Sequence, residues 1–322
     1  MESNRTVLVL GASGGVGGEV ARQLQKDGWQ VRALKRGLGA PSQHREGIHW
    51  IEGDALRAAD VAAAATDCSV IVHAVNPPGY RHWSEQGLPM LDHTIAAASA
   101  QRATILLPGN VYNYGPDAFP LIAEDAPQYP RTRKGAVRVE MERRLESASR
   151  GGAVRVLIVR AGDFFGPATA SSWFSQGMVK PGRPVTLVRL PGRGVGHQFA
   201  YLPDVAQTMA RLLARRHVLP AFARFHMGGY WDPDGMELGR AVQRVVARRG
   251  GAAPSLQPFP WWLVSLAAPF VATLREIKEM RYLWTEPVRL DNRRLVEALG
   301  EEPRTPLDAA IQATLEGMGC LP

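Results

Sequence analysis

Three polar side chains in the middle of the chain have the types needed for acid–base chemistry on a carbonyl group. Asn110 and Tyr112 lie in the turn-rich segment 108–116, and Lys134 follows further along the chain. An amide can orient a substrate carbonyl, a phenol can donate a proton, and a partly buried lysine can act as a general acid or base. By type, Lys134 and Tyr112 are candidates for a proton donor and Asn110 is a candidate for orienting a substrate; the resemblance described below is what implies a catalytic role for them.

Each of these side chains also has a purely structural interpretation. Lys134, Arg138 and Glu142 are spaced four residues apart, so they could form ion pairs along the exposed face of a helix. Tyr112 and Tyr114 could pack under a ligand or against neighbouring elements, because aromatic rings often do so at such turns. The sequence leaves both interpretations open.

A glycine-rich turn follows the first apolar run, Val7–Leu10, and leads into a stretch of helical composition. Gly11 permits a tight turn, Gly14 lets the backbone approach a ligand, and Gly17 lets helix and strand pack closely. The free N–H groups at the start of the helix suit a pyrophosphate. The segment 10–18 therefore predicts a dinucleotide site that uses Gly11, Ser13, Gly14, Val16 and Gly17.

The second apolar run ends in Lys35 and Arg36, without the carboxylate that binds the ribose 2′-hydroxyl of NAD at this position. Two cations there can bind a 2′-phosphate, and arginine offers a planar fork of donors. The sequence favours NADP(H) over NAD. The alternative is that both cations simply face solvent.

Elements that would position these residues alternate regularly in the first half of the chain. Short apolar runs at 7–10, 31–34, 70–73, 104–107 and 154–159 predict strands, and helical stretches at 18–27, 56–65, 90–100 and 137–149 separate them. Parallel strands joined by crossover helices give an α/β fold with a doubly wound, Rossmann-type sheet.

The second half changes character, because proline and glycine gather at 181–184 and 191–194 and tryptophan and proline gather near residue 261. We expect a nucleotide-binding domain over 1–165, to which residues 198–228 return with a helix at 203–214 and a strand at 224–227. The smaller substrate-binding lobe would take residues 166–197 and 229–322.

Composition describes an ordinary globular chain of 322 residues with a formal charge of +8. Its cations are scattered, so no nucleic-acid partner is expected. Cys68 and Cys320 cannot build a disulfide framework or a zinc site, and the N-terminus has no signal-peptide pattern, so we expect a cytoplasmic protein without a structural metal. The apolar stretch 258–274 is too short to span a bilayer and is expected to be buried or interfacial.

Further segments strengthen the interpretation of the glycine turn as a dinucleotide site. Residues 53–56 read Gly-Asp-Ala-Leu, and residues 73–76 read His-Ala-Val-Asn. Together with the glycine turn and with segments 160–167, 199–206 and 305–311, they resemble the extended and atypical short-chain dehydrogenase/reductases, the NAD(P)-dependent epimerase/dehydratase group. The resemblance covers nearly the whole chain. It implies that the cofactor also contacts the following residues: Asp54, Ala55, His73, Ala74, Val75, Asn110 and Lys134.

The chain departs from that family at the catalytic positions. The family uses a Ser or Thr where Asn110 stands, and a Tyr four residues before a Lys, whereas Tyr129 is followed four residues later by Arg133. The spacing of Lys134, Arg138 and Glu142 resembles the isoflavone-reductase-like branch, in which a lysine is catalytic. For His73, a core histidine bonded within the protein is the alternative.

The expected function is that of an NADP-dependent oxidoreductase acting on a small hydrophobic or aromatic carbonyl or enone substrate. Aromatic residues of the second half are expected near its cleft: Trp173, Phe174, Phe199, Tyr230, Trp231, Trp261 and Trp262. Alternatives are an NADP(H)-binding redox sensor without the usual catalytic set, and an epimerase or isomerase that uses the cofactor transiently. A homodimer is possible, and docking of the 261–274 segment on a membrane has only its composition in favour.

Overall fold

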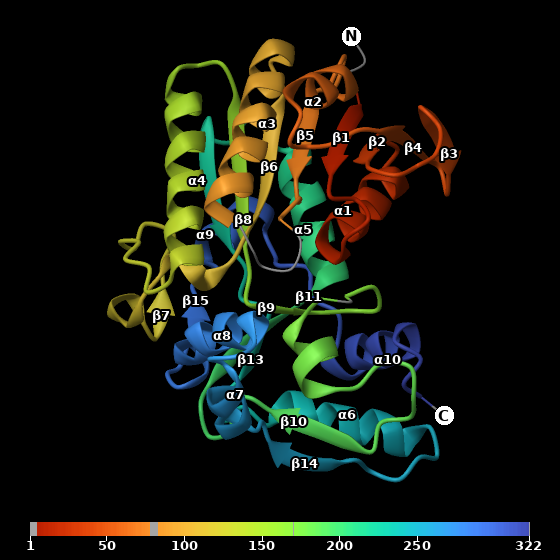
Figure 1. The fold of residues 1–322 in the computed structure, drawn as a ribbon, viewed down its shortest axis with the longest axis vertical. Coiled ribbons are helices and arrows are strands. Elements are labelled where there is room, and N and C mark those ends of the chain that lie inside the picture. Colours follow the sequence, from red (N-terminus) through yellow and green to blue (C-terminus); the bar gives the residue numbers. More distant parts are fainter. Residues whose placement is uncertain (1–4, 78–82, 170, 322) are drawn as a thin grey trace.

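The computed structural model describes residues 5–77, 83–169 and 171–321. Its main sheet has the strand order β12-β8-β6-β5-β1-β2-β4-β3, with helices on both faces (Figure 1). Its neighbouring strands are parallel, except that β3 runs antiparallel to β4. The strands are β1 (Thr6–Leu10), β2 (Gln30–Lys35), β3 (Ser42–Arg45), β4 (Ile48–Glu52), β5 (Val70–His73), β6 (Thr104–Gly109), β8 (Arg155–Arg160) and β12 (Phe222–His226). The predicted doubly wound, Rossmann-type sheet is confirmed.

The central strands are buried on both faces, so they read as continuous apolar runs. Val7 and Val9 pack on one face with Val20 of α1 and Val205 of α5, whereas Leu8 faces the other side. The flanking helices are α1 (Gly15–Lys26), α2 (Ala58–Ala64), α3 (Leu88–Gln101), α4 (Arg133–Arg150), α5 (Leu202–Ala214) and α9 (Arg293–Leu299). Residues 1–4, where no leader is expected, lie outside the described residues.

The strands at the two edges of this sheet differ in whether the sequence predicted them. The strand expected at 224–227 is present as β12, which pairs with β8 at the edge of the sheet. Strands β3 and β4 were not predicted, because β3 is exposed along its length and β4 alternates only weakly between apolar and polar residues. Their pairing extends the sheet beyond β2.

A second core lies below the carboxyl end of the main sheet in Figure 1. It is built from the three-stranded sheet β13-β11-β9, the pair β10-β14 and helices α6 and α10. The strands are β9 (Asp163–Phe165), β10 (Leu187–Leu190), β11 (His197–Tyr201), β13 (Tyr230–Asp232) and β14 (Ser255–Pro258), and a further pair is β7 (Leu121–Ile122) with β15 (Arg289–Leu290). The helices are α6 (Glu237–Arg248), α7 (Trp261–Ala267), α8 (Ala272–Glu279) and α10 (Leu307–Gly317), and the short helices are η2 (Trp83–Gly87), η3 (Val111–Asn113), η4 (Pro116–Ala118), η5 (Phe174–Met178) and η6 (Met280–Trp284).

Asp204, in the first turn of α5, joins the main sheet to the C-terminal segment. Its carboxylate accepts hydrogen bonds from the Tyr230 hydroxyl at 3.1 Å, the Thr305 amide at 2.9 Å and the Thr305 hydroxyl at 2.7 Å. Asp204 is 6 % exposed, so these three donors replace the water that the carboxylate loses on burial. The arrangement fixes the start of α10 against the rest of the molecule.

The apolar stretch 258–274 forms α7 and the start of α8. Val264 is the buried residue of α7 and Ala268 follows it, whereas Trp262 and Leu266 are exposed. None of the helices in the described ranges combines the length and the apolar character that crossing a membrane requires. The stretch is therefore exposed at the surface for much of its length.

Candidate functional site

The glycine turn between β1 and α1 is closed so tightly that side chains would not fit. Gly11 has φ +88°, and a Cβ on it would lie 2.5 Å from the Ala74 carbonyl oxygen, while a Cβ on Gly17 would lie 2.3 Å from the Gly11 oxygen. Gly14 precedes α1, and no side chain caps its N-terminus. This end of α1 therefore offers unshielded N–H groups of the kind that bind a pyrophosphate. Ser13 is exposed and Val16 is half-buried beside them.

Lys35 and Arg36 lie at the carboxyl end of β2, as predicted for a group that holds a 2′-phosphate. Lys35 Nζ lies 5.7 Å from the Trp50 ring centroid, and Arg36 Nη1 lies 3.6 Å from Asp54 Oδ2. β2 itself ends without a carboxylate, but Glu52 of β4 brings one close by, accepting hydrogen bonds from the Gly37 and Leu38 amides at 2.9 and 2.5 Å. The structure thus adds an acidic neighbour that the sequence analysis did not consider.

Asp54 and Ala55 form a turn beside this strand end. Asp54 Oδ1 accepts a hydrogen bond from the Leu56 amide at 3.0 Å, and the Ala55 carbonyl accepts one from His93 Nδ1 at 3.0 Å. Both residues are half-buried, and the salt bridge from Arg36 ties the turn to the end of β2. The residues expected to contact the cofactor at this strand end therefore form one contiguous group.

His73 ends β5 and is a core residue rather than an accessible donor. Its Nδ1 lies 2.8 Å from the Thr94 hydroxyl, which in turn donates to the Met90 carbonyl, so Nδ1 carries the hydrogen. Burial, together with the positive charge of Arg138, lowers the pKa of His73 to about 3. His73 therefore stays neutral and is held by Thr94, and Ala74 and Val75 follow it directly in the chain.

Asn110 and Tyr112 begin the turn after β6, next to the start of α4. Asn110 Oδ1 accepts a hydrogen bond from the Tyr112 amide at 3.0 Å and so caps η3. A Cβ on Gly135 would lie 2.2 Å from the Tyr112 carbonyl oxygen, so α4 approaches this turn backbone to backbone. The structure brings Asn110, Tyr112 and the first turn of α4 together, and Lys134 belongs to that turn.

Lys134 is buried and contacts a carboxylate from a distant part of the chain. Its Nζ lies 2.6 Å from Glu276 Oε2 of α8, with the lysine side chain 6 % exposed and the glutamate side chain 31 % exposed. The first turn of a helix carries a positive partial charge, which is unfavourable for an ammonium group. The carboxylate of Glu276 offsets this unfavourable interaction of the Lys134 ammonium group with the start of α4.

Arg138 and Glu142 also point inward, so the interpretation of an exposed row of ion pairs is wrong. Arg138 Nη2 donates to Asn76 Oδ1 at 3.0 Å and its guanidinium lies 5.1 Å from the Trp83 ring centroid. Because Asn76 follows the β5 end against which Gly11 packs, this contact joins the glycine turn to the Lys134 face of α4. Glu142 instead pairs with Arg160 at 2.6 Å in a fully buried contact. The three residues share one inward face because 3.6 residues make a turn.

The Glu142–Arg160 pair belongs to a polar network under the turn after β6. Arg160 also donates to the Asn113 side chain, to the Asn110 carbonyl and to His226 Nε2. Burial, followed by the charge of Arg160, lowers the pKa of His226 well below its usual value, which matches its role as an acceptor. The network holds the backbone of Asn110 from below.

The family's tyrosine has no counterpart in this arrangement. Tyr129 is 66 % exposed, and Pro130 occupies the position four residues before Lys134. Of the aromatic residues expected near the cleft, Phe174, Phe199 and Tyr230 are buried in the core of the second lobe and Trp262 faces solvent. The expectation that the three buried rings line a substrate cleft is wrong, because Phe174 and Tyr230 pack on Phe165 and Phe199 packs on His197 inside that core. The remaining three, Trp173, Trp231 and Trp261, are half-buried.

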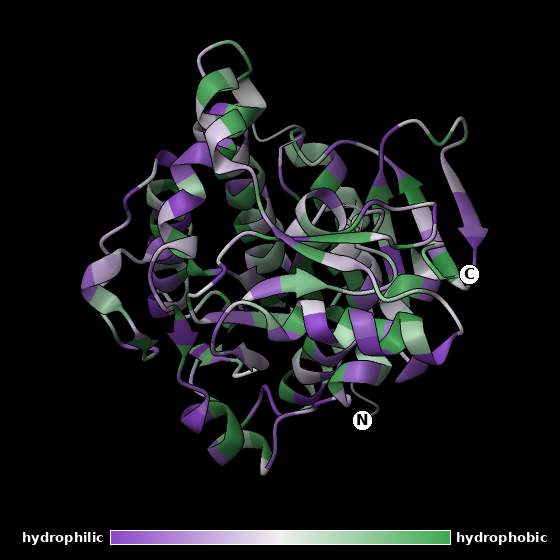
Figure 2. Ribbon diagram, turned by 90° about the horizontal axis from the view of Figure 1, so that it is seen from below, coloured by the Kyte–Doolittle hydropathy of each residue, from purple (hydrophilic) through white to green (hydrophobic). Residues whose placement is uncertain are grey.

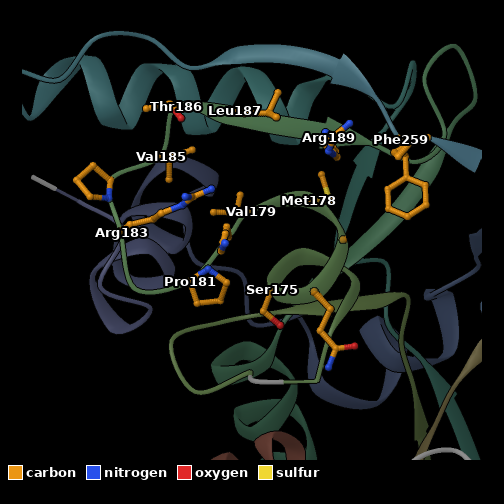
Figure 3. A pocket seen from close by; sticks show the side chains of 15 residues that line it. Ser175, Met178, Val179, Pro181, Arg183, Val185, Thr186, Leu187, Arg189 and Phe259 are labelled. Atoms are coloured by element: carbon orange, nitrogen blue, oxygen red, sulfur yellow. The ribbon is translucent and has the colours of Figure 1, made fainter. Parts of the chain in front are cut away.

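A separate pocket of about 510 Å³ lies in the second lobe, between η5, β10 and the segment before α7. Lys180, Arg183 and Arg189 line it together with Met178 and Phe259. Figure 3 shows Arg183 reaching inward from its loop toward Val179. Among the described residues, no group of three or more His, Cys, Asp or Glu side chains could hold a metal ion.

Two contributors to the site escaped the sequence analysis. Glu276 is far from Lys134 in sequence and carries no motif, although it stands in a short helix next to an apolar stretch. Arg160 was noted only as part of a family turn, and the apolar run 156–159 before it gave no sign that it pairs with Glu142. Only the fold reveals these contacts.

Comparisons with known proteins agree with the fold. The family model described as NAD dependent epimerase/dehydratase family matches residues 7–228. The chain is similar in structure to UDP-glucose 4-epimerase from Brucella ovis in complex with NAD (14% identity, TM-score 0.73) and to a putative epimerase from Burkholderia cenocepacia J2315 (18% identity, TM-score 0.72), covering 98% of each chain in both comparisons. It is also similar to MoeE5 in complex with UDP-glucose and NAD (18% identity, TM-score 0.69), covering 97% of this chain and 98% of that one. A search of curated proteins found no match.

Proposed function

Since the chain belongs to the NAD-dependent epimerase/dehydratase family, we propose that it is an NADP-dependent oxidoreductase that reduces a hydrophobic or aromatic carbonyl compound or enone. The observation that carries the proposal is Lys134 in the first turn of α4, which is buried and paired with Glu276. Gly135 of the same turn packs on the Tyr112 carbonyl. This arrangement supplies a proton donor where the family's Tyr–Lys pair is absent.

The residues present fit a dinucleotide. The absent Cβ atoms of Gly11 and Gly17 leave room for the closed turn, the start of α1 would hold the pyrophosphate, and Lys35 and Arg36 would hold a 2′-phosphate. A reduced nicotinamide supplies hydride when bound. The carboxylate of Glu52 also lies close to this cation pair. The preference for NADP over NAD is therefore tested directly by the titration described below.

The chain's own residues would manage the proton and the orientation of the substrate. Lys134 would donate a proton to the carbonyl oxygen as the carbon receives hydride, which yields an alcohol and the oxidised nucleotide. Asn110 Oδ1 is engaged by the Tyr112 amide, so the amino group of Asn110 is the part that can orient the substrate. Tyr112 is the second candidate for the donor.

An apolar substrate is supported by half-buried rings on the lobe side of this cluster. Phe119 and Tyr282 stack with an interplanar angle of 1° and ring centroids 6.4 Å apart, and the Tyr282 hydroxyl donates to the Tyr114 carbonyl. Tyr112 is half-buried beside them. Such rings favour aromatic or hydrophobic ligands.

The first test is a fluorescence titration with NADPH and NADH. We expect Arg36→Ala to weaken NADPH binding about tenfold, because it removes a charge-assisted contact, and to leave NADH binding unchanged. Arg45→Ala, on the exposed strand β3, is the matched control and should bind both nucleotides as the wild type does. Failure of the wild type to bind either nucleotide contradicts the assignment of the glycine turn.

The second test follows NADPH loss with aromatic ketones, enones and quinones. Lys134→Met should lower turnover about 100-fold with nucleotide binding retained, whereas Lys26→Met at the far end of α1 should have no effect. If Lys134→Met and Tyr112→Phe both keep full turnover, the catalytic assignment is wrong.

A redox sensor is the second candidate function. It is favoured by Asn110 acting as a cap and by Pro130 standing four residues before Lys134, which leave the family's usual set incomplete. It predicts tight NADPH binding, no turnover and a change of assembly on binding. A defined product from steady NADPH consumption excludes it. An epimerase or isomerase that uses the cofactor transiently would change the substrate without any net change in the nucleotide.

A further inference from the structure

Five large apolar side chains are exposed within ten residues of α7 and the turn that follows it. Trp262 and Leu266 are each 68 % exposed and Phe270 is 87 % exposed, and Leu263 and Val271 stand beside them. The other exposed large apolar residues of the described chain are scattered: Leu121, Tyr129, Val218 and Val296. Isolated exposures are ordinary, but a contiguous cluster marks an interaction surface.

The helical hairpin that carries this cluster is anchored on its other side. Trp261 Nε1 donates to the Pro191 carbonyl at 2.8 Å, and its ring lies 4.9 Å from that of Phe259 and 5.7 Å from that of Trp173. Helices α7 and α8 lie side by side in Figure 1, and Figure 2 shows green, hydrophobic ribbon on the hairpin that projects from the molecule. The apolar cluster is thus exposed on a hairpin whose opposite side is packed against the protein.

Cations surround this face without acidic partners. On the hairpin and the turn after it, Arg275, Lys278 and Arg281 make no ion pair with any described residue, and Glu279 is the unpaired carboxylate among them. Some arginines elsewhere do form ion pairs, as Arg143 does with Glu140. The surface therefore has a net positive charge next to its apolar cluster.

The cationic pocket extends the same surface. Phe259 and Pro260 line that pocket and lead directly into α7. Its cations Lys180, Arg183 and Arg189 likewise make no ion pair within the described part of the chain. Apolar side chains and unpaired cations thus lie next to one another along this side of the lobe.

We propose that α7 and the turn after it dock on the surface of an anionic lipid bilayer. The exposed apolar side chains would enter the boundary between headgroups and acyl chains, where tryptophan is favoured. The cations would face the lipid phosphates. A seven-residue helix is too short to span, so it would lie in the plane of the surface. A second copy fits less well, because pairing the same face would place like charges together.

This surface lies next to the candidate site, since α8 also carries Glu276, the partner of Lys134. Docking would bring the rim of that site close to the bilayer, where apolar substrates concentrate. The proposal does not depend on catalysis, because vesicle binding is measured without turnover.

The test is co-sedimentation of the full chain with vesicles at low salt. One set contains phosphatidylcholine alone and the other contains phosphatidylglycerol and phosphatidylcholine at about 1:3. We expect binding to the anionic vesicles and little to the neutral ones. The double variant Trp262→Ser with Phe270→Ser should lose affinity at least about tenfold, because it removes two apolar side chains that would enter the bilayer. Val218→Ser, with 84 % exposure on a distant loop, is the matched control and should bind as the wild type does.

Charge is tested separately with Arg275→Gln and Lys278→Gln. Each should reduce affinity for anionic vesicles about fivefold and leave unfolding transitions unchanged, since neither side chain forms an ion pair with the described residues. No binding of the wild type to anionic vesicles overturns the proposal, and so does equal binding by the double variant. A dimer in ultracentrifugation that the double variant dissociates, without vesicle binding, assigns the face to a second copy instead.

Discussion

Replacing Glu142 with glutamine should destabilise the protein far more than the same change at Glu140, two residues away on α4. Glu142 is 5 % exposed and faces Arg160, which is 0 % exposed, at 2.6 Å. Removing one partner of a buried pair leaves an uncompensated charge and costs about 3–5 kcal/mol. Glu140 contacts two arginines, Arg143 and Arg144, but these pairs lie at the surface, where each is worth about 0.2–1 kcal/mol.

The measurement is the free energy of unfolding in urea, followed by tryptophan fluorescence and circular dichroism for the wild type, Glu142→Gln and Glu140→Gln. Each variant has one negative charge fewer than the wild type. A difference in stability between the two variants therefore reports the burial of the lost carboxylate and not the change in net charge. A loss at Glu142 no larger than that at Glu140 would refute the reasoning. In a double-mutant cycle with Arg160→Met, the second change should recover part of the loss.

The Glu142–Arg160 pair also makes the free energy of unfolding depend on pH. Burial alone raises the pKa of Glu142, but the charge of Arg160, hydrogen bonds from Gln128 and Arg160 and the charge of Arg224 outweigh it and hold the pKa below its usual value. A carboxyl with a depressed folded pKa contributes stability that is present above its unfolded pKa and lost as pH falls through the folded pKa. The Glu142→Gln variant should therefore lose less stability than the wild type below about pH 4.

Two further predictions concern the cofactor side of the sheet. His73 has a folded pKa of about 3 against 6.5 unfolded, so its contribution to stability is complete above pH 6.5 and falls as pH drops toward 3. Between pH 7 and pH 5 that loss is about 2 kcal/mol, and His73→Gln should remove it from urea unfolding curves; an unchanged pH dependence would contradict the assignment. Gly17→Ala should abolish nucleotide binding in a fluorescence titration, since its Cβ would lie 2.3 Å from the Gly11 oxygen, whereas Gly151→Ala, with 3.4 Å to its nearest neighbour, should bind normally.

The strands of the main sheet could be predicted within about two residues, because buried parallel strands leave uninterrupted apolar runs. Val70–His73, for example, is both the predicted run and the observed β5. β4 escaped because only Ile48 of its residues is buried, so its pattern is not that of a buried strand. Burial on both faces is the property that made a strand visible in the sequence.

The candidate site could be predicted in its local parts and not in its long-range partners. The glycine turn and the segment around Asn110 are contiguous, so their spacing alone carries the signal. The Lys134–Glu276 contact joins two segments that share no pattern, and the helical spacing of Lys134, Arg138 and Glu142 fits an exposed face as well as a buried one. Only the packing of α4 decides which face is inside.

Asp204 also sets a constraint on how the protein matures during synthesis. Its carboxylate is satisfied by Tyr230 and by Thr305, which lies 101 residues further along the chain. A ribosome adds roughly 5–20 residues per second, so about 5–20 s pass between the synthesis of Asp204 and that of its last partner. During that interval a carboxylate destined for burial lacks two of its three donors. We therefore expect α5 to settle fully against the sheet only after the segment around Thr305 has been synthesised, so that α5 is formed well before its packing is complete.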